Sequence, residues 1–163
     1  MSLDGYIAGP KGEADWIIMD PEIDFKALFS QFDTMLLGRK TFEAVLKQGG
    51  AGGMPGLRTY VFSRTLRQTD HPDVTVVAER PMETLKGLKK TSGKDIWLMG
   101  GGSLFGSLLE IGMVDTVEVA VIPVVLGVGI PLLPSPAKQA TLKLTHTKVY
   151  KKTGVVSLAY AVK

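Results

Sequence analysis

Three consecutive glycines, Gly100, Gly101 and Gly102, follow an apolar run that ends at Met99 and precede a segment with helical apolar spacing. This pattern predicts a buried strand, a turn without side chains and the start of a helix. Glycines let the main chain bring its N–H groups close to a ligand, and a helix N-terminus favours an anion such as a phosphate. The alternative is a tight strand-to-helix turn that binds nothing, and the triplet alone leaves both interpretations open.

Cations and hydroxyls occupy two further segments, each where a predicted strand ends. Residues 38–41 read Gly-Arg-Lys-Thr, and residues 63–65 read Ser-Arg-Thr. Arginine recognises phosphate through two parallel hydrogen bonds, and a loop serine adds a hydroxyl donor. Ligands of open α/β sheets bind at the carboxyl ends of the strands. Although each segment alone could be ordinary surface, the three together favour a dinucleotide with a further phosphate far from its pyrophosphate.

Composition excludes several other classes of function. The chain has 163 residues, with 45% hydrophobic and 21% charged residues, which suits one globular domain over residues 1–163. It contains no cysteine and only two histidines, so the sequence indicates no metal site and no thiol chemistry. The net charge of +3 is scattered and aromatic residues make up 7%, which argues against nucleic acid as a partner. No segment predicts a membrane span or a signal peptide, so we expect a cytoplasmic protein.

The predicted elements alternate between strands and helices. The predicted strands are 3–8, 34–37, 59–62, 74–78, 96–99, 117–122, 142–150 and 155–162, and the predicted helices are 21–32, 39–47, 81–90 and 104–111. This order indicates an α/β fold with three α/β/α layers, a mostly parallel central sheet and an antiparallel C-terminal hairpin.

Six segments, in this order, resemble the dihydrofolate reductase-like superfamily, and within it the small bacterial proteins related to the reductase (RibD C-terminal) domain of riboflavin biosynthesis. The segments are 2–8, 15–16, 38–42, 63–65, 100–102 and 122–127. The resemblance covers nearly the whole chain and implies an NADPH-dependent reductase acting on a small pterin-, pyrimidine- or folate-like heterocycle. The residues that it implies for the cofactor are Ile7, Ala8, Gly38, Arg39, Lys40, Thr41, Ser63, Arg64, Gly100, Gly101, Gly102, Ser103, Leu104 and Phe105.

Within this set, the resemblance implies that different residues contact different parts of the cofactor. Arg39 is the candidate for the 2′-phosphate, Ser63 and Arg64 flank the adenosine end, and Ile7 and Ala8 line the nicotinamide. The glycine triplet and the residues after it, through Phe105, carry the pyrophosphate.

The chain also departs from the family pattern in two places. Relatives carry a complete first strand ahead of the Ser-x-Asp-Gly segment, whereas Met1 directly precedes Ser2 here, so we expect an incomplete first strand. The riboflavin reductases have a glutamate where this chain has Gly100, and that glutamate helps to hold their sugar-phosphate substrate. Its absence argues against the same substrate here.

The resemblance leaves the proton donor open. Folate reductases use a carboxylate on the first helix, and Asp20, Glu22 and Asp24 all lie near that place, of which one at most would serve. The alternative is that these acids only favour a helix N-terminus. A non-catalytic nucleotide-binding protein of the same fold therefore stays open as a second function.

Three further residues are candidates for the substrate side. Trp16 and Phe25 could form a wall of the substrate site, or belong to the core as such aromatics often do. Asp4 could orient the loop over the site, or only cap a turn.

The segment 124–133 is long and apolar, yet its two glycines and its proline break a regular strand. Exposed connections are seldom so apolar, so we expect it to pack against a second copy in a homodimer. The alternatives are that it folds onto its own core, or that assembly is the protein's main output.

Overall fold

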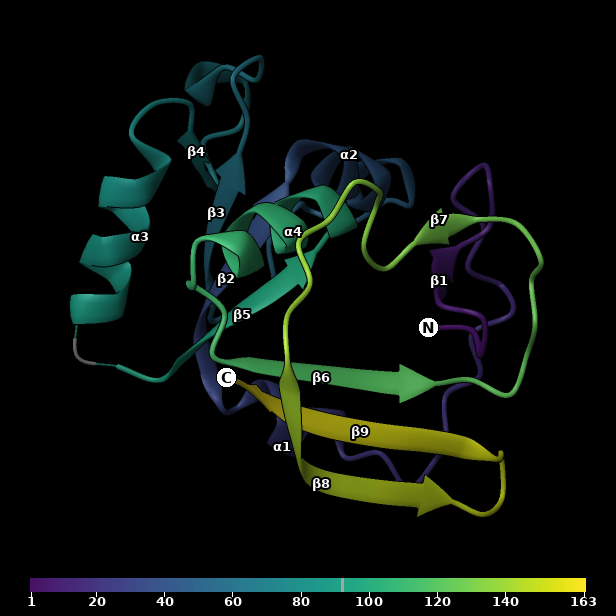
Figure 1. Ribbon diagram of the computed structural model, residues 1–163. Coiled ribbons are helices and arrows are strands. Elements are labelled where there is room, and N and C mark those ends of the chain that lie inside the picture. The colour runs from purple at the N-terminus through teal and green to yellow at the C-terminus, as the bar shows by residue number, and fades with distance from the viewer. Residues whose placement is uncertain (92) are drawn as a thin grey trace. The chain divides into compact units, whose positions relative to one another are not determined.

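The computed structural model describes residues 1–91 and 93–163 (Figure 1). The chain divides into two compact units. The parallel unit is Phe25–Leu104, and the antiparallel unit combines Met1–Asp24 with Phe105–Lys163. The prediction of a single domain over residues 1–163 stays a prediction.

The parallel unit is built on a four-stranded sheet in which every neighbouring pair is parallel. The order is β4 (Thr75–Val77), β3 (Arg58–Phe62), β2 (Phe32–Gly38) and β5 (Asp95–Gly100). In the register Leu37 of β2 lies opposite both Val61 and Gly100. The carboxyl ends of three neighbouring strands therefore meet at one edge of the sheet.

Four helices belong wholly or partly to this unit. They are α1 (Phe25–Phe29), α2 (Arg39–Lys47), α3 (Pro81–Lys90) and α4 (Gly102–Glu110), whose first three residues lie in the parallel unit. Helix α3 begins with Pro81, whose fixed φ and missing N–H suit a first helical position. A short 3-10 turn, Gln68–Asp70, precedes β4.

The core of the parallel unit explains why its strands are nearly continuous apolar runs. Met35 and Leu37 of β2, Val61 of β3 and Phe42 of α2 are at most 3% exposed and form one cluster. Leu36, which points to the other face of β2, is equally buried. Strands buried on both faces need apolar side chains at successive positions, unlike half-exposed strands, which alternate.

The amino end of β2 is held by a polar network around Asp33. Its carboxylate accepts hydrogen bonds from the Thr34 hydroxyl at 2.7 Å, the Lys94 N–H at 3.0 Å and the Arg58 guanidinium at 3.1 Å. These donors favour the ionised form and lower the pKa of Asp33 to about 2, with the Thr34 hydroxyl as the largest cause. The network therefore depends on an ionised Asp33.

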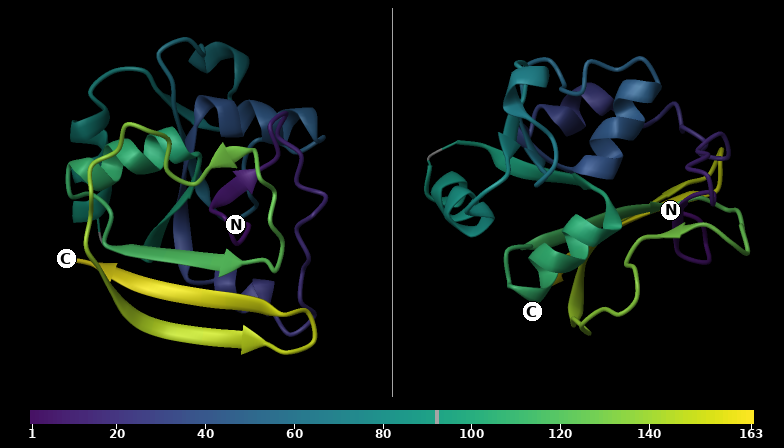
Figure 2. Two further views of the ribbon diagram at one scale, coloured as in Figure 1. Left: turned by 45° about the vertical axis from the view of Figure 1, so that its right-hand side comes forward. Right: turned by 90° about the horizontal axis from the view of Figure 1, so that it is seen from above.

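The antiparallel unit contains a three-stranded sheet and a two-stranded ribbon. The three-stranded order is β6 (Thr116–Val121), β9 (Val155–Val162) and β8 (Leu142–Tyr150), and the ribbon pairs β1 (Tyr6–Ala8) with β7 (Ile130–Pro131). Figure 2 shows the long hairpin of β8 and β9 with β6 beside it. The core at the hairpin turn consists of Ile122, Tyr150 and Val155, with Trp16 and Ile23 packed against it.

The predicted fold class is confirmed in its main features, an α/β fold with a parallel sheet and a C-terminal antiparallel hairpin. The helix predicted over 21–32 is wrong, because only Phe25–Phe29 is helical and β2 already begins at Phe32. The Asp20 carboxylate accepts a hydrogen bond from the Glu22 N–H, and this local turn competes with a helix start. In the part of the chain that the structure describes, no helix is long and apolar enough to cross a membrane.

Candidate cofactor-binding site

The starts of two helices lie next to each other at the carboxyl ends of β2 and β5. Gly38 ends β2 and caps α2, and Gly102 begins α4 two residues after β5 ends. A methyl group added to Gly38 would lie 3.7 Å from the Gly100 carbonyl oxygen and from the Gly101 nitrogen. A methyl group added to Gly101 would lie 2.9 Å from Thr41 Oγ1. The two glycine turns are therefore in direct contact.

This contact determines what the site can bind. The α2 N-cap, Gly38, makes no side-chain capping hydrogen bond, so the first-turn N–H groups have no acceptor from the cap residue. N–H groups and helix dipoles at two adjacent helix starts create a locus for an anion. Gly100 has a φ of +134°, a conformation available to glycine alone without strain, and the peptide bond between Gly100 and Gly101 is cis.

The structure gives Arg39 a partner that the sequence interpretation omitted. Arg39 Nη1 lies 2.8 Å from Glu43 Oε1, an ion pair between side chains that are 41% and 39% exposed. The i,i+4 spacing on a helix is the signal that could have revealed it. The Arg39 guanidinium is thus partly neutralised, whereas the neighbouring Lys40 is exposed and Thr41 is half-buried.

Ser63 and Arg64 have different roles in the structure. Ser63 is 8% exposed, and its Oγ accepts hydrogen bonds from the N–H groups of Thr65 at 3.1 Å and Leu66 at 3.0 Å. These bonds fix the turn after β3, and Gly38 lies opposite Phe62 in the same register. Arg64 is exposed and forms no ion pair within residues 1–91 and 93–163. Its guanidinium is therefore the freer of the two predicted phosphate-binding arginines.

The remaining cofactor residues fall in two places. Ser103 and Leu104 continue the first turn of α4 in the parallel unit, next to the glycine triplet. Ile7, Ala8 and Phe105 belong to the antiparallel unit, the first two in β1 and the third in α4. The nicotinamide and pyrophosphate roles of these residues stay predictions.

Among the three predicted acids, Asp20 is the buried one at 1% exposure. Its Oδ2 accepts a hydrogen bond from the Thr153 hydroxyl at 2.6 Å, and its Oδ1 accepts one from the Glu22 N–H at 2.9 Å. These two hydrogen bonds, that from Thr153 above all, hold the pKa of Asp20 below its usual value. An ionised carboxylate with both oxygens engaged is a poor proton donor and links the 20–22 turn to the β8–β9 turn. Glu22 and Asp24 are exposed.

Asp4 is exposed and accepts hydrogen bonds from the Leu126 N–H at 3.2 Å and the Gly127 N–H at 2.7 Å. The pKa of Asp4 is lowered, first by a hydrogen bond from Ser2 and then by these N–H groups. These contacts tie the Asp4 carboxylate to the 124–133 segment, and a role of Asp4 on the substrate side stays a prediction.

The two predicted aromatic residues on the substrate side both pack within their own units. The Trp16 indole N–H donates to the Glu13 carbonyl at 3.2 Å, and its ring packs on the core at the hairpin turn. Phe25 stacks on Phe29 with ring centroids 5.9 Å apart. A role in substrate binding stays a prediction for both.

The fold matches that of reductases of known structure. Dihydrofolate reductase from Enterococcus faecalis, in complex with NADP(H), superimposes with a TM-score of 0.69 over 100% of this chain and 92% of that chain at 19% identity. A protein from Shewanella sp. PV-4 assigned to riboflavin biosynthesis gives a TM-score of 0.83 over 100% and 95% of the two chains at 24% identity. At these identities the similarity shows the fold.

The sequence comparison is more specific. The model of the RibD C-terminal domain matches residues 1–156, and the chain therefore belongs to this family. Uncharacterized protein YyaP of Bacillus subtilis (strain 168) is 37% identical over 171 residues, covering 98% of this chain and 90% of that protein. The resemblance identified from the sequence motifs is confirmed.

Proposed function

We propose that the protein is an NADPH-dependent reductase that transfers hydride to a small pterin-, pyrimidine- or folate-like heterocycle. The observation that carries this proposal is the contact between the two helix starts at the ends of β2 and β5. The family match and the NADP(H)-bound Enterococcus neighbour support it. We also propose that the protein works in the cytoplasm.

The residues at the strand ends fit a dinucleotide phosphate. A side chain at Gly101 would lie against Thr41 Oγ1, in the turn that leads directly into α4. Main-chain N–H groups of both helix starts would bind the pyrophosphate, and Arg64 and Arg39 would bind an outlying phosphate. Bound NADPH would supply the hydride, so the protein's own task is to bind, orient and exclude water.

The protein's part in proton transfer is restricted by Asp20. Its lowered pKa keeps this carboxylate ionised at neutral pH, so it acts as a hydrogen-bond acceptor that fixes the 20–22 turn. An acceptor that needs a proton would receive it from water or from the exposed Glu22 or Asp24. We therefore expect Asp20→Asn to lower the free energy of unfolding and to have only a small effect on the rate of the chemical step.

The test has two readouts on one sample. Binding is followed by the fluorescence of NADPH during titration, and turnover by loss of NADPH absorbance with dihydropterin, folate and aminopyrimidine acceptors. We expect saturable binding and turnover with at least one acceptor, and the Gly101→Val variant as control should show neither. Absence of NADPH binding in a folded wild-type protein would overturn the proposal.

A second candidate is a non-catalytic nucleotide-binding protein of the same fold. The observation that favours it is that both Asp20 oxygens accept hydrogen bonds, one from Thr153 and one from Glu22. The buried carboxylate then has no proton to donate to a substrate. Saturable NADPH binding without turnover of any acceptor would support this function and exclude the reductase.

A further inference from the structure

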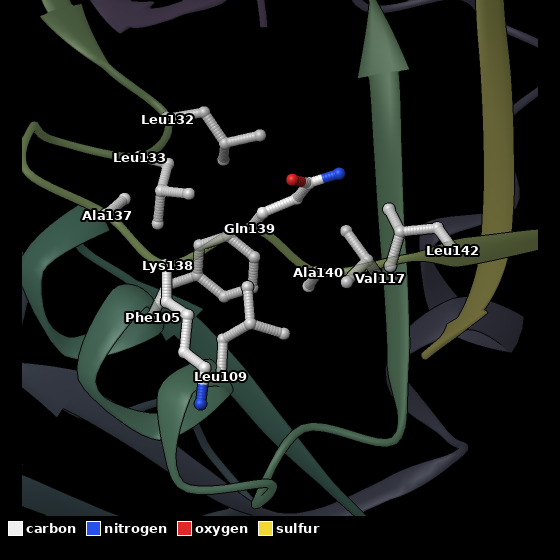
Figure 3. Close-up of a pocket in the computed structure, with 10 residues that line it drawn as sticks. All are labelled: Phe105, Leu109, Val117, Leu132, Leu133, Ala137, Lys138, Gln139, Ala140 and Leu142. Atoms are coloured by element: carbon white, nitrogen blue, oxygen red, sulfur yellow. The ribbon is translucent and has the colours of Figure 1, made fainter. Parts of the chain in front are cut away.

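A cavity of about 390 Å³ lies within the antiparallel unit (Figure 3). Its walls come from α4, from β6, from the start of β8 and from the segment 132–141 that connects β7 to β8. The large apolar side chains that line it are Phe105, Leu109, Val117, Leu132, Leu133 and Leu142. Apart from Phe105, no residue expected to bind the cofactor lines this cavity, so the proposed reductase site does not explain it.

The connecting segment is held at both of its ends. The Leu132 N–H donates to the Gly5 carbonyl at 2.9 Å, and the Lys163 N–H donates to the Thr141 carbonyl at 3.0 Å. Leu133 packs on α4, because a methyl group added to Gly106 would lie 3.1 Å from its Cδ1 atom. Residues 137–140, between these anchors, are exposed. The cavity is therefore the space left between the fixed ends of this segment, α4 and the sheet.

The lining suits an apolar molecule better than water. Lys138 and Gln139 are the two polar side chains among the ten residues that line the cavity. Figure 3 shows their polar groups at different ends, the ammonium group on the side of Leu109 and the amide on the side of Leu132. An ordered water needs two to four polar partners close together. Apolar side chains that face an empty space lose dispersion contacts, which an apolar molecule would restore.

The charge at the cavity selects an anion. None of the lining residues carries a carboxylate, and Lys138 forms no ion pair within residues 1–91 and 93–163. An unpaired ammonium group beside apolar side chains attracts an anion and repels a cation. A phosphate with two charges is usually bound by several donors, whereas one ammonium group matches a single carboxylate.

The volume limits the size of the occupant. Ligand pockets commonly measure about 300–1,000 Å³, so this cavity lies near the lower end of that range. An apolar cavity of about 150 Å³ binds one benzene ring, so about 390 Å³ suits a body of roughly ten to fifteen carbon atoms. A medium-length alkyl chain or a two-ring aromatic body has this size.

We propose that this cavity binds a free apolar monocarboxylate, whose carboxylate pairs with Lys138 and whose body packs among Leu109, Val117 and Leu133. Binding is noncovalent, and the proposal does not depend on the reductase activity. Helix, sheet and connecting segment surround the space, which suits a single molecule rather than a membrane surface.

The test compares three ligands that share one alkyl chain and differ in charge. Displacement of the fluorescent probe 8-anilinonaphthalene-1-sulfonate by decanoate, 1-decanol and decylammonium is measured well below the concentrations at which micelles form. We expect decanoate to bind about fivefold more tightly than decanol, the effect of one exposed charge pair, and decylammonium to bind more weakly than decanol.

Two kinds of variant separate the charge from the cavity. Lys138→Met keeps the apolar stem and removes the ammonium group, so it should weaken decanoate about fivefold and leave decanol unchanged. Leu109→Trp fills the space and should weaken both ligands by at least about 10-fold. Val117→Phe is a second filling variant, and circular dichroism reports whether each protein is folded.

Two control variants are matched to these changes. Lys143→Met removes an exposed lysine of β8 that does not line the cavity, and Gln139→Leu removes the amide at the end away from the ammonium group. Both should keep the wild-type preference for decanoate over decanol. Absence of saturable decanoate binding, equal affinities for decanoate and decanol, or unchanged binding in folded Leu109→Trp and Val117→Phe proteins would overturn the proposal.

Discussion

The two sheets of this protein use apolar residues differently. In the parallel sheet Met35, Leu36 and Leu37 follow one another along β2 and are all buried. In the antiparallel sheet the large apolar residues of β8 stay exposed until Tyr150, at 9%. The parallel sheet therefore places the proposed binding site at the ends of strands that are buried on both faces, whereas the edge strand of the antiparallel sheet leaves apolar side chains exposed.

The largest effect that this comparison predicts is on stability. Leu37→Ala should lower the free energy of unfolding by about 3 kcal/mol, because it leaves a cavity in a fully buried cluster. Leu144→Ala, on an exposed position, should change it by less than about 0.5 kcal/mol. Urea denaturation measures both. Similar losses for the two variants would contradict the difference between the sheets.

Gly101→Val tests whether the ends of the parallel strands bind the cofactor. The branched side chain would meet Thr41 Oγ1 in the turn that leads into α4, where we propose that the pyrophosphate binds. We expect NADPH affinity to fall by at least about 100-fold, which corresponds to roughly 2.7 kcal/mol. Fluorescence titration gives the affinity and circular dichroism the folded state. A folded variant with wild-type affinity would exclude the glycine triplet from the site.

The two arginines of the parallel unit should contribute unequally to NADPH preference. We expect the wild type to bind NADPH more tightly than NADH, and Arg64→Ala to reduce that preference by about 10-fold, since one charged hydrogen bond is worth about 1.5 kcal/mol or more. Arg39→Ala should have a smaller effect because Glu43 partly neutralises this guanidinium.

The matched variant Glu43→Gln removes the competing carboxylate and should strengthen NADPH binding without altering NADH affinity. Titrations of both cofactors provide the comparison. Affinities for NADPH and NADH within a factor of two in the wild type would refute the assignment of both arginines.

A smaller effect is expected on the stability of the folded protein at low pH, and it involves Asp33 at the amino end of β2. The pKa of Asp33 is about 2 in the folded protein and near 3.8 when unfolded, so its contribution is present above pH 4 and is lost as the pH falls toward 2. Asp33→Asn should be less stable than the wild type at pH 7 and should lose less stability on acidification. Denaturation midpoints from pH 7 to pH 2 measure this. Parallel pH curves for the two proteins would contradict the role of the ionised Asp33.

The elements predicted most reliably from the sequence are those whose apolar spacing and end residues match the way they pack in the structure. The helices Arg39–Lys47 and Pro81–Lys90 and both strands of the hairpin were predicted with the observed bounds. The predicted 21–32 helix failed because the hydrogen bond of a single side chain, Asp20, fixes a turn that apolar spacing does not reveal. The two-residue strand β7 exists only through its pairing with β1, which is invisible in local sequence.

At the candidate site, the sequence identified the three strand ends but not the state of each side chain. Parallel strand order brings Gly38 and Gly101 together, and that followed from the alternation of elements. Neither the pairing of Arg39 with Glu43 nor the use of Ser63 as a turn acceptor was predicted. Such assignments depend on side-chain orientation, which residue types and spacing only partly determine.

The contact between the two glycine turns has a consequence for how this protein can evolve. The groups that face the proposed phosphate belong to the main chain, which every amino acid shares, so substitutions at exposed positions such as Lys40 and Ser103 leave those groups unchanged. Only the replacement of a glycine, which adds side-chain atoms at the point of contact, would obstruct access to them. Lineages can thus diverge in nearly every neighbouring side chain, and acquire new substrates, while keeping the main-chain groups of the proposed nucleotide site.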